Sequence, residues 1–332
     1  MASYFENSAD TLVSDALAGF ARAHADLLTL DPAHGFLLAR AASPHRRVAL
    51  LSGGGTGHEP LHAGYVGRGM LDAACPGRVF ASPHNRQVYE GSLAAAREDG
   101  VLHIVKNYTG DRINFGIAAE RLAHRGVPCA RVLVDDDLAS DAEEIASGRR
   151  GTGGTVLVEK ILGGAADTGL GLGELQALGT RLAARCRTLA VASAAHTSPT
   201  LGEPAFRLAA GELEYGVGIH GERARSSAHH VPLAALVERM AGELLEALAV
   251  EPGATVVTLV NGLGAVTPLE LYATHGELAR VLDDRGIVLA RGLVGDYVTA
   301  LDMRGFSLTV LLAEPADLAF YDAPVCTAAL RW

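Results

Sequence analysis

Residues 47–62 read RVALLSGGGTGHEPLH, and the rest of the chain is interpreted outward from them. The apolar run at 48–51 predicts a buried strand, and the three glycines at 53–55 follow it directly. Glycine amides carry no Cβ, so a small oxygen-rich ligand can approach them closely. His58 and His62 come next, at the carboxyl end of the strand, where open α/β sheets bind ligands. The stretch therefore predicts a substrate loop, with a plain glycine turn and a solvated histidine as the structural alternative.

Length and composition indicate a globular protein of more than one domain. A chain of 332 residues corresponds to about two domains. No apolar run reaches the roughly 18 residues that a membrane span needs. Residues 1–20 also lack a basic start followed by an apolar core. We therefore expect a cytoplasmic protein that does not enter a membrane.

Charge and cysteine usage argue against a nucleic-acid-binding, a disulfide-rich or a zinc-binding protein. A formal net charge of −10 argues against nucleic-acid binding, which needs clustered Lys and Arg. The acidic run at 135–137 is expected to cap a helix or to face water. The cysteines form no CxxC pair and are expected to be buried small side chains, not disulfides or zinc ligands. They are Cys75, Cys129, Cys186 and Cys326.

Strand and helix patterns alternate along the chain, which predicts two layered α/β domains with mixed sheets. Prolines interrupt the pattern near 187–205, so the predicted domains are 1–186 and 187–332. The expected helices are 8–29, 85–98, 113–125, 155–166, 172–186, 231–248 and 268–284, and residues 61–74 are expected to form a loop and a short helix. The expected strands are 48–51, 79–83, 101–105, 130–134, 188–193, 213–219, 254–260, 287–293 and 306–313.

No nucleotide-binding motif is present. A P-loop requires GxxxxGK[ST], and His58 stands where its lysine would be needed. A GxGxxG fingerprint beginning at Gly53 would require glycine at the same position. The glycine-rich segments 148–154 and 169–173 satisfy neither pattern. We therefore expect no cofactor on this chain.

His58 and His62 enclose a glutamate with the spacing of an HExxH zinc site. Pro60 lies inside the helix that such a site requires, where it removes a donor and clashes with the preceding turn. A histidine at the end of a glycine loop is better suited to proton transfer or to orienting a hydroxyl. No metal is expected, and a zinc hydrolase is a distant alternative.

Lys106 and Asp111 flank residues 107–110 after a second predicted strand. An amine and a carboxylate held on one tight turn can bind a small polyol and supply a base. The structural alternative is a surface turn with a local ion pair.

His220 closes the predicted strand 213–219, between glycines at 218 and 221. Little crowds a histidine between glycines, and imidazole is a competent nucleophile toward a carbonyl carbon. The alternative is a structural histidine with satisfied hydrogen bonds.

Taken together, the motifs resemble the substrate-binding subunit of dihydroxyacetone kinase, in order and over nearly the whole chain. The matching segments are LLSGGGTGHEPLHAGYVGRGML at 50–71, VFASP at 79–83, IVKNYTGDRINF at 104–115, DDD at 135–137, GRRGTGGTVLVEKILGGAA at 148–166, EYGVGIHGE at 214–222, and the closing LDMRGFSLTVL and DAPVCTAALRW.

The resemblance implies two α/β domains, a homodimer and an active site between the domains. It implies that His220 forms a covalent hemiaminal with a ketone carbonyl, while His58 and Asp111 act as general acid and base. The substrate oxygens would be held by Lys106 and by the loop residues Gly54, Gly55, Thr56 and Gly57.

Two departures from the family pattern qualify these implications. After Glu222 the family usually continues Pro-Gly, whereas residues 223–227 here read RARSS, which leaves open a related ketose such as erythrulose. The chain ends at Trp332, where single-chain ATP-dependent forms continue into a nucleotide domain. We therefore expect ATP or ADP with Mg on a partner kinase subunit, either used directly or recharged by a phosphoenolpyruvate-fed phosphocarrier relay.

A binding module without catalysis is the main rival. Some family relatives bind dihydroxyacetone through the same histidine and act as coactivators that sense it for a transcriptional regulator. A sensor needs the tether but not the base, so His58, Lys106 and Asp111 favour the enzyme.

Overall fold

The computed structural model describes residues 4–140, 148–223 and 226–332. By their packing contacts these residues form two compact units. The glycine-loop unit comprises 5–134, 155–183 and 316–332, and the His220 unit comprises Tyr4, 135–140, 148–154, 184–223 and 226–315.

These units differ from the two consecutive domains predicted from sequence. One boundary, at 183/184, lies close to the predicted join at 186/187. The described residues of 135–154, however, pack with the His220 unit, and 316–332 pack with the glycine-loop unit. The prolines that marked the predicted join interrupt elements locally, but they carry no information about which sheet a later helix covers.

The glycine-loop unit contains a mixed six-stranded sheet in the order β1-β2-β4-β3-β5-β6. The pairs β3–β4, β3–β5 and β5–β6 are parallel, and β1–β2 and β2–β4 are antiparallel. The carboxyl ends of β3 and β5 therefore lie side by side at one edge. The strands are β1 Leu28–Asp31, β2 Phe36–Ala39, β3 Ala49–Thr56, β4 Ala73–Val79, β5 Val101–Lys106 and β6 Cys129–Val134.

Successive residues of β3 face opposite sides of this sheet, as strand geometry requires. Ala49 and Leu51 pack into a core with residues of α2 and α3, whereas Ser52 contacts His62 on the other face. The helices of this unit are α1 Leu12–Ala23, α2 Asn85–Ala95, α3 Thr109–His124, α4 Gly154–Ala166, α5 Leu172–Ala184 and α8 Pro315–Asp322, with a short helix η1 at Ala63–Tyr65.

The His220 unit contains a second mixed sheet, in the order β11-β10-β12-β7-β8-β9. Only β10 and β11 pair in parallel among its described strands. The strands are β7 Cys186–Ala194, β8 Glu212–Tyr215, β9 Ser226–His229, β10 Thr255–Gly262, β11 Val288–Gly295 and β12 Arg304–Leu312; the helices are η2 Leu138–Ser140, α6 Leu233–Ala247 and α7 Pro268–Asp284.

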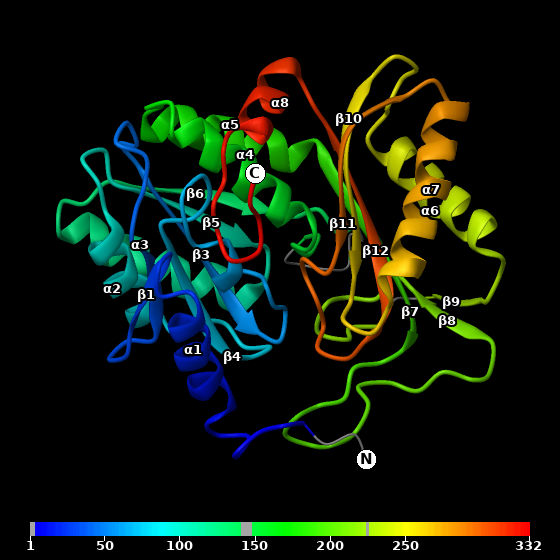
Figure 1. Cartoon of the computed structure of the whole chain (residues 1–332), viewed down its shortest axis with the longest axis horizontal. Coiled ribbons are helices and arrows are strands. Elements are labelled where there is room, and N and C mark those ends of the chain that lie inside the picture. The colour runs from blue at the N-terminus through cyan, green and yellow to red at the C-terminus, as the bar shows by residue number, and fades with distance from the viewer. Residues whose placement is uncertain (1–3, 141–147, 224–225) are drawn as a thin grey trace. The chain divides into compact units, whose positions relative to one another are not determined.

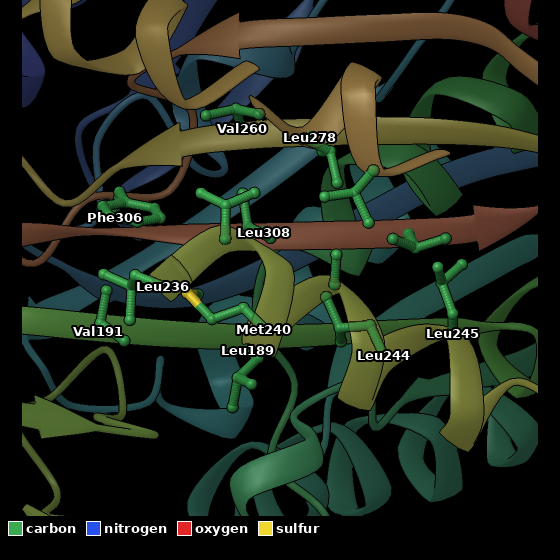
Figure 2. Close-up of a cluster of buried hydrophobic side chains, with 14 of the residues drawn as sticks. Leu189, Val191, Leu236, Met240, Leu244, Leu245, Val260, Leu278, Phe306 and Leu308 are labelled. Carbon is green, nitrogen blue, oxygen red and sulfur yellow. The ribbon is translucent and has the colours of Figure 1, made fainter. Parts of the chain in front are cut away.

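Helices α6 and α7 share the core of this second sheet (Figures 1 and 2). Met240 of α6 and Leu278 of α7 lie in one buried cluster with Val191 of β7, Val260 of β10 and Leu308 of β12. Burying a side chain of this size stabilises the fold by about 1.5–3 kcal/mol. This core fixes β7 and β8, which lead to His220.

Both units are α/β with mixed sheets, so the predicted fold class is confirmed. Among the described helices none is both long and apolar enough to cross a bilayer. The strand predicted at 79–83 lies at 73–79, as β4. The described structure also contains the β1–β2 hairpin, β9 and α8, which were not predicted.

Candidate functional site

The three glycines belong to strand β3, which continues through them to Thr56, so they are not a loop that ends the strand. A Cβ on Gly53 would lie 2.6 Å from the Cys75 carbonyl oxygen. A Cβ on Gly55 would lie 2.6 Å from the Ala81 amide nitrogen. A Cβ on Gly54 would collide with Nζ of Lys106. Glycine is needed here because neighbouring backbone and an amine pack directly on the strand.

The residues after the glycines form a turn that hydrogen bonds hold in place. Thr56 donates its hydroxyl hydrogen to the Gly77 carbonyl over 3.2 Å, and the Gly57 amide donates to the Glu59 carboxylate over 3.0 Å. Burial raises the pKa of Glu59. Gly57 has a φ of 96°, which favours glycine. This turn presents the next residue, His58, in a fixed position.

His58 is buried, and its ring stacks on Phe80 with 4.9 Å between ring centroids. It is therefore not the solvated histidine of the structural alternative. Stacking holds the imidazole plane in one orientation, as a group that transfers a proton to a bound substrate requires.

Lys106 ends β5 and is almost fully buried. Its Nζ lies 2.9 Å from Nε2 of His62, and Nδ1 of His62 lies 2.7 Å from Oε1 of Glu159. Burial lowers the pKa of Lys106, and the negative charges of Asp111 and Glu159 oppose this shift. The predicted amine is thus held inside the unit and not on a surface turn.

Asp111 lies in the first turn of α3, which starts at Thr109, four residues earlier than expected. Only two residues, Asn107 and Tyr108, separate β5 from this helix, so the predicted four-residue turn was wrong. Asp111 is buried and accepts a hydrogen bond from the Ser82 hydroxyl. A helix N-terminus favours a negative charge, which suits a carboxylate at this position.

His220 follows β8 but does not close it, because the strand ends at Tyr215. Its Nδ1 lies 2.9 Å from Oε1 of Glu222, and its backbone amide donates to Oε2 of the same carboxylate over 2.9 Å. Burial raises the pKa of Glu222, but the hydrogen bond and charge of His220, with Arg150, lower it overall to about 2. An ionised carboxylate only accepts, so Nδ1 carries the proton and Nε2 carries the lone pair.

Arg150 holds the far side of Glu222. Its Nε donates to Oδ2 of Asp137 over 2.6 Å, its Nη2 donates to the Gly216 carbonyl over 3.2 Å, and its Nη1 lies 3.8 Å from Oε2 of Glu222. Burial raises the pKa of Asp137 to about 6 despite the opposing charge of Arg150. A continuous polar chain therefore runs from Asp137 to the imidazole of His220.

Asp136 is fully buried, so of the two alternatives for residues 135–137, a helix cap or exposure to water, the second does not hold for this residue. Its carboxylate accepts from the Thr152 amide over 2.7 Å and from the Gly154 amide over 2.8 Å. It also accepts from the Thr188 hydroxyl over 2.5 Å. The acidic run therefore shapes the segment that leads into α4, in line with the expected capping role.

Arg223 occupies the position where the family pattern expects proline. Its Nε donates to Oε2 of the buried Glu214 over 3.0 Å, and its guanidinium lies 5.9 Å from the ring centre of Phe206. Ser226 and Ser227, the last two residues of the divergent segment 223–227, belong to β9; residues 224 and 225 lie outside the described part of the chain.

The structure brings four predicted groups together within the glycine-loop unit: Gly54 and Lys106 in contact, Asp111 acting electrostatically on Lys106, and His58 acting on the neighbouring His62. His220 belongs to the other unit. Sequence reasoning missed four partners that the family segments contain: Ser82 in VFASP, Glu222 in HGE, Arg150 in GRRG and Glu159 in VLVEK.

The zinc alternative is not supported by the geometry of His62. Both of its ring nitrogens lie within hydrogen-bond distance of protein partners, Glu159 and Lys106. Within 4–140, 148–223 and 226–332, no group of three or more His, Cys, Asp or Glu side chains has an arrangement suited to a metal.

Comparisons with known proteins give one consistent result. The Dak1 domain family model matches residues 18–329. The PEP-dependent dihydroxyacetone kinase, dihydroxyacetone-binding subunit DhaK, of Escherichia coli K12 is 40% identical over 98% of both chains. The dihydroxyacetone kinase of C. freundii has a TM-score of 0.89 and 36% identity, covering 100% of this chain and 60% of its own. The dihydroxyacetone kinase operon co-activator Dha-DhaQ has a TM-score of 0.88 and 31% identity, covering 95% of this chain and 96% of its own.

Proposed function

The chain belongs to the Dak1 domain family, and from this premise we propose that it is the dihydroxyacetone-binding subunit of a dihydroxyacetone kinase. It is thus part of a phosphotransferase with an alcohol group as acceptor. The resemblance predicted from the sequence motifs is confirmed by the match over nearly the whole chain.

The observation that carries the substrate assignment is the pairing of His220 with Glu222. Glu222 keeps the proton on Nδ1 over a 2.9 Å contact, so Nε2 attacks the ketone carbon. The carbonyl π electrons move to oxygen, which takes up a proton as Nδ1 releases its own toward Glu222. The net reaction adds N–H across C=O and loses no water. A covalent tether of this kind selects a ketone and rejects glycerol.

In the proposed site Asp111 and His58 act as the base and acid that activate the accepting hydroxyl. The buried position of both groups supports this role, because proton transfer needs a fixed, water-poor environment. Lys106 and the backbone of residues 54–57 would hold the substrate oxygens. Lys106 can reach this strand because residue 54 has no side chain.

The phosphate donor is proposed to reside on a partner subunit that carries ATP or ADP with Mg. The E. coli relative, which aligns over 98% of both chains, is named as the dihydroxyacetone-binding subunit of a PEP-dependent kinase, and this supports a separate donor fed by a phosphoenolpyruvate relay. We also propose that the chain is a homodimer, as the family resemblance implies.

A dihydroxyacetone-sensing coactivator is the second candidate, because the Dha-DhaQ co-activator matches the fold with a TM-score of 0.88. Covalent binding of the ketose is common to both candidates. The buried Asp111 and its Ser82 contact favour the kinase, since a sensor does not need a base.

The test combines adduct detection with reconstitution. Dihydroxyacetone labelled with ¹³C at the ketone should lose its carbonyl resonance and gain a tetrahedral one on binding, and His220→Ala should abolish this change. Mg-ATP, or phosphoenolpyruvate with its relay, should then give triose phosphate only when a partner subunit is added. An adduct that persists in His220→Ala would refute the tether, and adduct formation without transfer by any partner would favour the coactivator. Running erythrulose in parallel identifies the preferred ketose.

A further inference from the structure

Lysine is used at only two of the 332 positions, Lys106 and Lys160, and every other basic residue among the 28 Lys and Arg is arginine. Both lysines are buried. Lys160 has a structural role, since its Nζ donates to the carbonyls of Phe320 and Ala323 over 3.2 and 3.0 Å. Lysine, unlike arginine, can lose its proton when buried. Lys106 is thus an amine whose charge depends on what surrounds it.

Lys106 ends a row of three polar side chains that crosses the interior of the glycine-loop unit. An ammonium group can only donate, so Nζ of Lys106 donates to Nε2 of His62 over 2.9 Å. The proton of the neutral imidazole then lies on Nδ1, which donates to Oε1 of Glu159 over 2.7 Å. Ser52 also contacts Nδ1, at 3.0 Å, and anchors this ring to β3.

Burial works against the charge at both ends of this row. It raises the pKa of Glu159 to about 8, while the Ser52 hydrogen bond and the charge of Lys106 act in the opposite direction. It lowers the pKa of Lys106, against the charges of Asp111 and Glu159. It also keeps His62 neutral, because burial and the charges of Lys106 and His58 lower the pKa of His62 well below its ordinary value. The charge of each group therefore favours the charged form of the other, while burial opposes both.

We infer that Glu159 and His62 are positioning residues, which hold the Lys106 amine against Gly54 and keep it protonated. The inference rests on the proposed function only in assigning Lys106 to the substrate oxygens. The arrangement is like a catalytic triad in its logic: a buried carboxylate orients an imidazole, which in turn orients the group that meets the substrate. Here that group is an ammonium donor in place of a hydroxyl nucleophile.

Two charged groups act on Lys106, Asp111 in the first turn of α3 and Glu159 on α4. His62, which follows β3, contacts Lys106 as a neutral imidazole, and the charge of His58 acts on His62. Neutralising Glu159 removes one of the two carboxylates that favour the ammonium form. The pKa of Lys106 should then fall further.

The small number of lysines makes this measurable directly. Protein labelled with [ε-¹³C]lysine has two resonances, and Lys160→Arg identifies the signal of Lys106. We expect Glu159→Gln to lower the pH midpoint of the Lys106 titration by about one pH unit. Glu90→Gln, the same change at a half-exposed position on α2 in the same unit, should leave it in place.

A midpoint that is unchanged or raised in Glu159→Gln would overturn the inference. If Glu159→Gln does not fold, His62→Gln decides by the same criterion, because it interrupts the row between the amine and the carboxylate. The titration needs neither substrate nor a partner subunit.

Turnover separates this inference from the proposed function. With a partner subunit, Glu159→Gln should raise KM for dihydroxyacetone about tenfold and change kcat little, because a charge-assisted hydrogen bond to the substrate weakens. A shifted Lys106 midpoint in a protein that forms no adduct would reject the proposed function and retain the positioning role. Full turnover in a variant whose Lys106 midpoint is unshifted would retain the proposed function and reject the positioning role.

Discussion

Glu222 accepts two hydrogen bonds from His220, one from Nδ1 and one from the backbone amide, each 2.9 Å long. A single carboxylate thus fixes both the ring and the backbone of the residue that we propose as the nucleophile. The contact spans only two residues of sequence, so it forms within one turn.

Replacing this carboxylate by an amide should weaken the adduct. Glu222→Gln keeps an acceptor opposite Nδ1 but removes its charge, and we expect the equilibrium constant for adduct formation to fall about tenfold, or about 1.4 kcal/mol. The ¹³C resonance of bound dihydroxyacetone measures it. Glu212→Gln, in β8 of the same unit, is the matched control and should bind as the wild type does. Equal adduct levels in both variants would show that Glu222 has no part in activating His220.

Asp111 should matter for turnover and not for the tether. A positioned base contributes about 10²–10⁴-fold to the rate, so Asp111→Asn should lower kcat by that range while the adduct resonance persists. Single-turnover transfer from a loaded partner subunit measures the chemical step. An unchanged rate would make Asp111 a structural residue of the α3 N-terminus.

Gly54 should be intolerant of a methyl group. Gly54→Ala places a Cβ where Nζ of Lys106 lies, so the amine must move and its hydrogen bond to His62 is lost. Loss of a charge-assisted bond predicts at least tenfold weaker binding of dihydroxyacetone. Gly116→Ala is the control, because a Cβ there meets nothing within 4 Å. Similar binding by the two variants would contradict the close packing of Lys106 on β3.

Asp137 should make the protein more stable as the pH falls from 7 to 5. Burial raises its pKa to about 6 in the fold, above the ordinary value of 3.8, so between these values the folded state holds the extra proton. The free energy of unfolding should then rise by up to about 1.4 kcal/mol per pH unit of acidification through this group.

The Asp137→Asn variant lacks this proton. The difference in thermal midpoint, wild type minus variant, should therefore shift in favour of the wild type from pH 7 to pH 5. A difference that is constant, or that shifts the other way, would mean that Arg150 outweighs burial at Asp137.

The sequence predicts well those elements whose pattern is local. The helix at 268–284 coincides with α7, whose Thr267 and Glu270 form a capping box, and the apolar run at 48–51 lies within β3. Strand β4 was misplaced because Pro76 and Gly77 are turn signals that here lie inside a strand beside β3. The run 216–219 alternates like a strand but leaves β8 after Tyr215.

In the candidate site, too, local features could be predicted and distant contacts could not. Histidines and carboxylates beside glycines could be identified as candidates from sequence alone. The partners that orient them could not, because Glu159 lies 97 positions from His62, and a glutamate inside an apolar helix carries no sign of what it faces. Arg150 is likewise distant in sequence from Glu222, whereas Glu222 lies only two positions from His220 and was missed although it is close.

The division of the chain into units has a consequence for its synthesis. Residues 316–332, including most of α8, pack with the unit that contains β1–β6, and Lys160 of α4 donates to two carbonyls of this segment. Because a chain is made from its N-terminus, β1–β6 are synthesised before residues 316–332. All six strands of this sheet therefore exist before the segment that completes the packing of their unit, and a chain cut before residue 316 would hold the sheet without that packing.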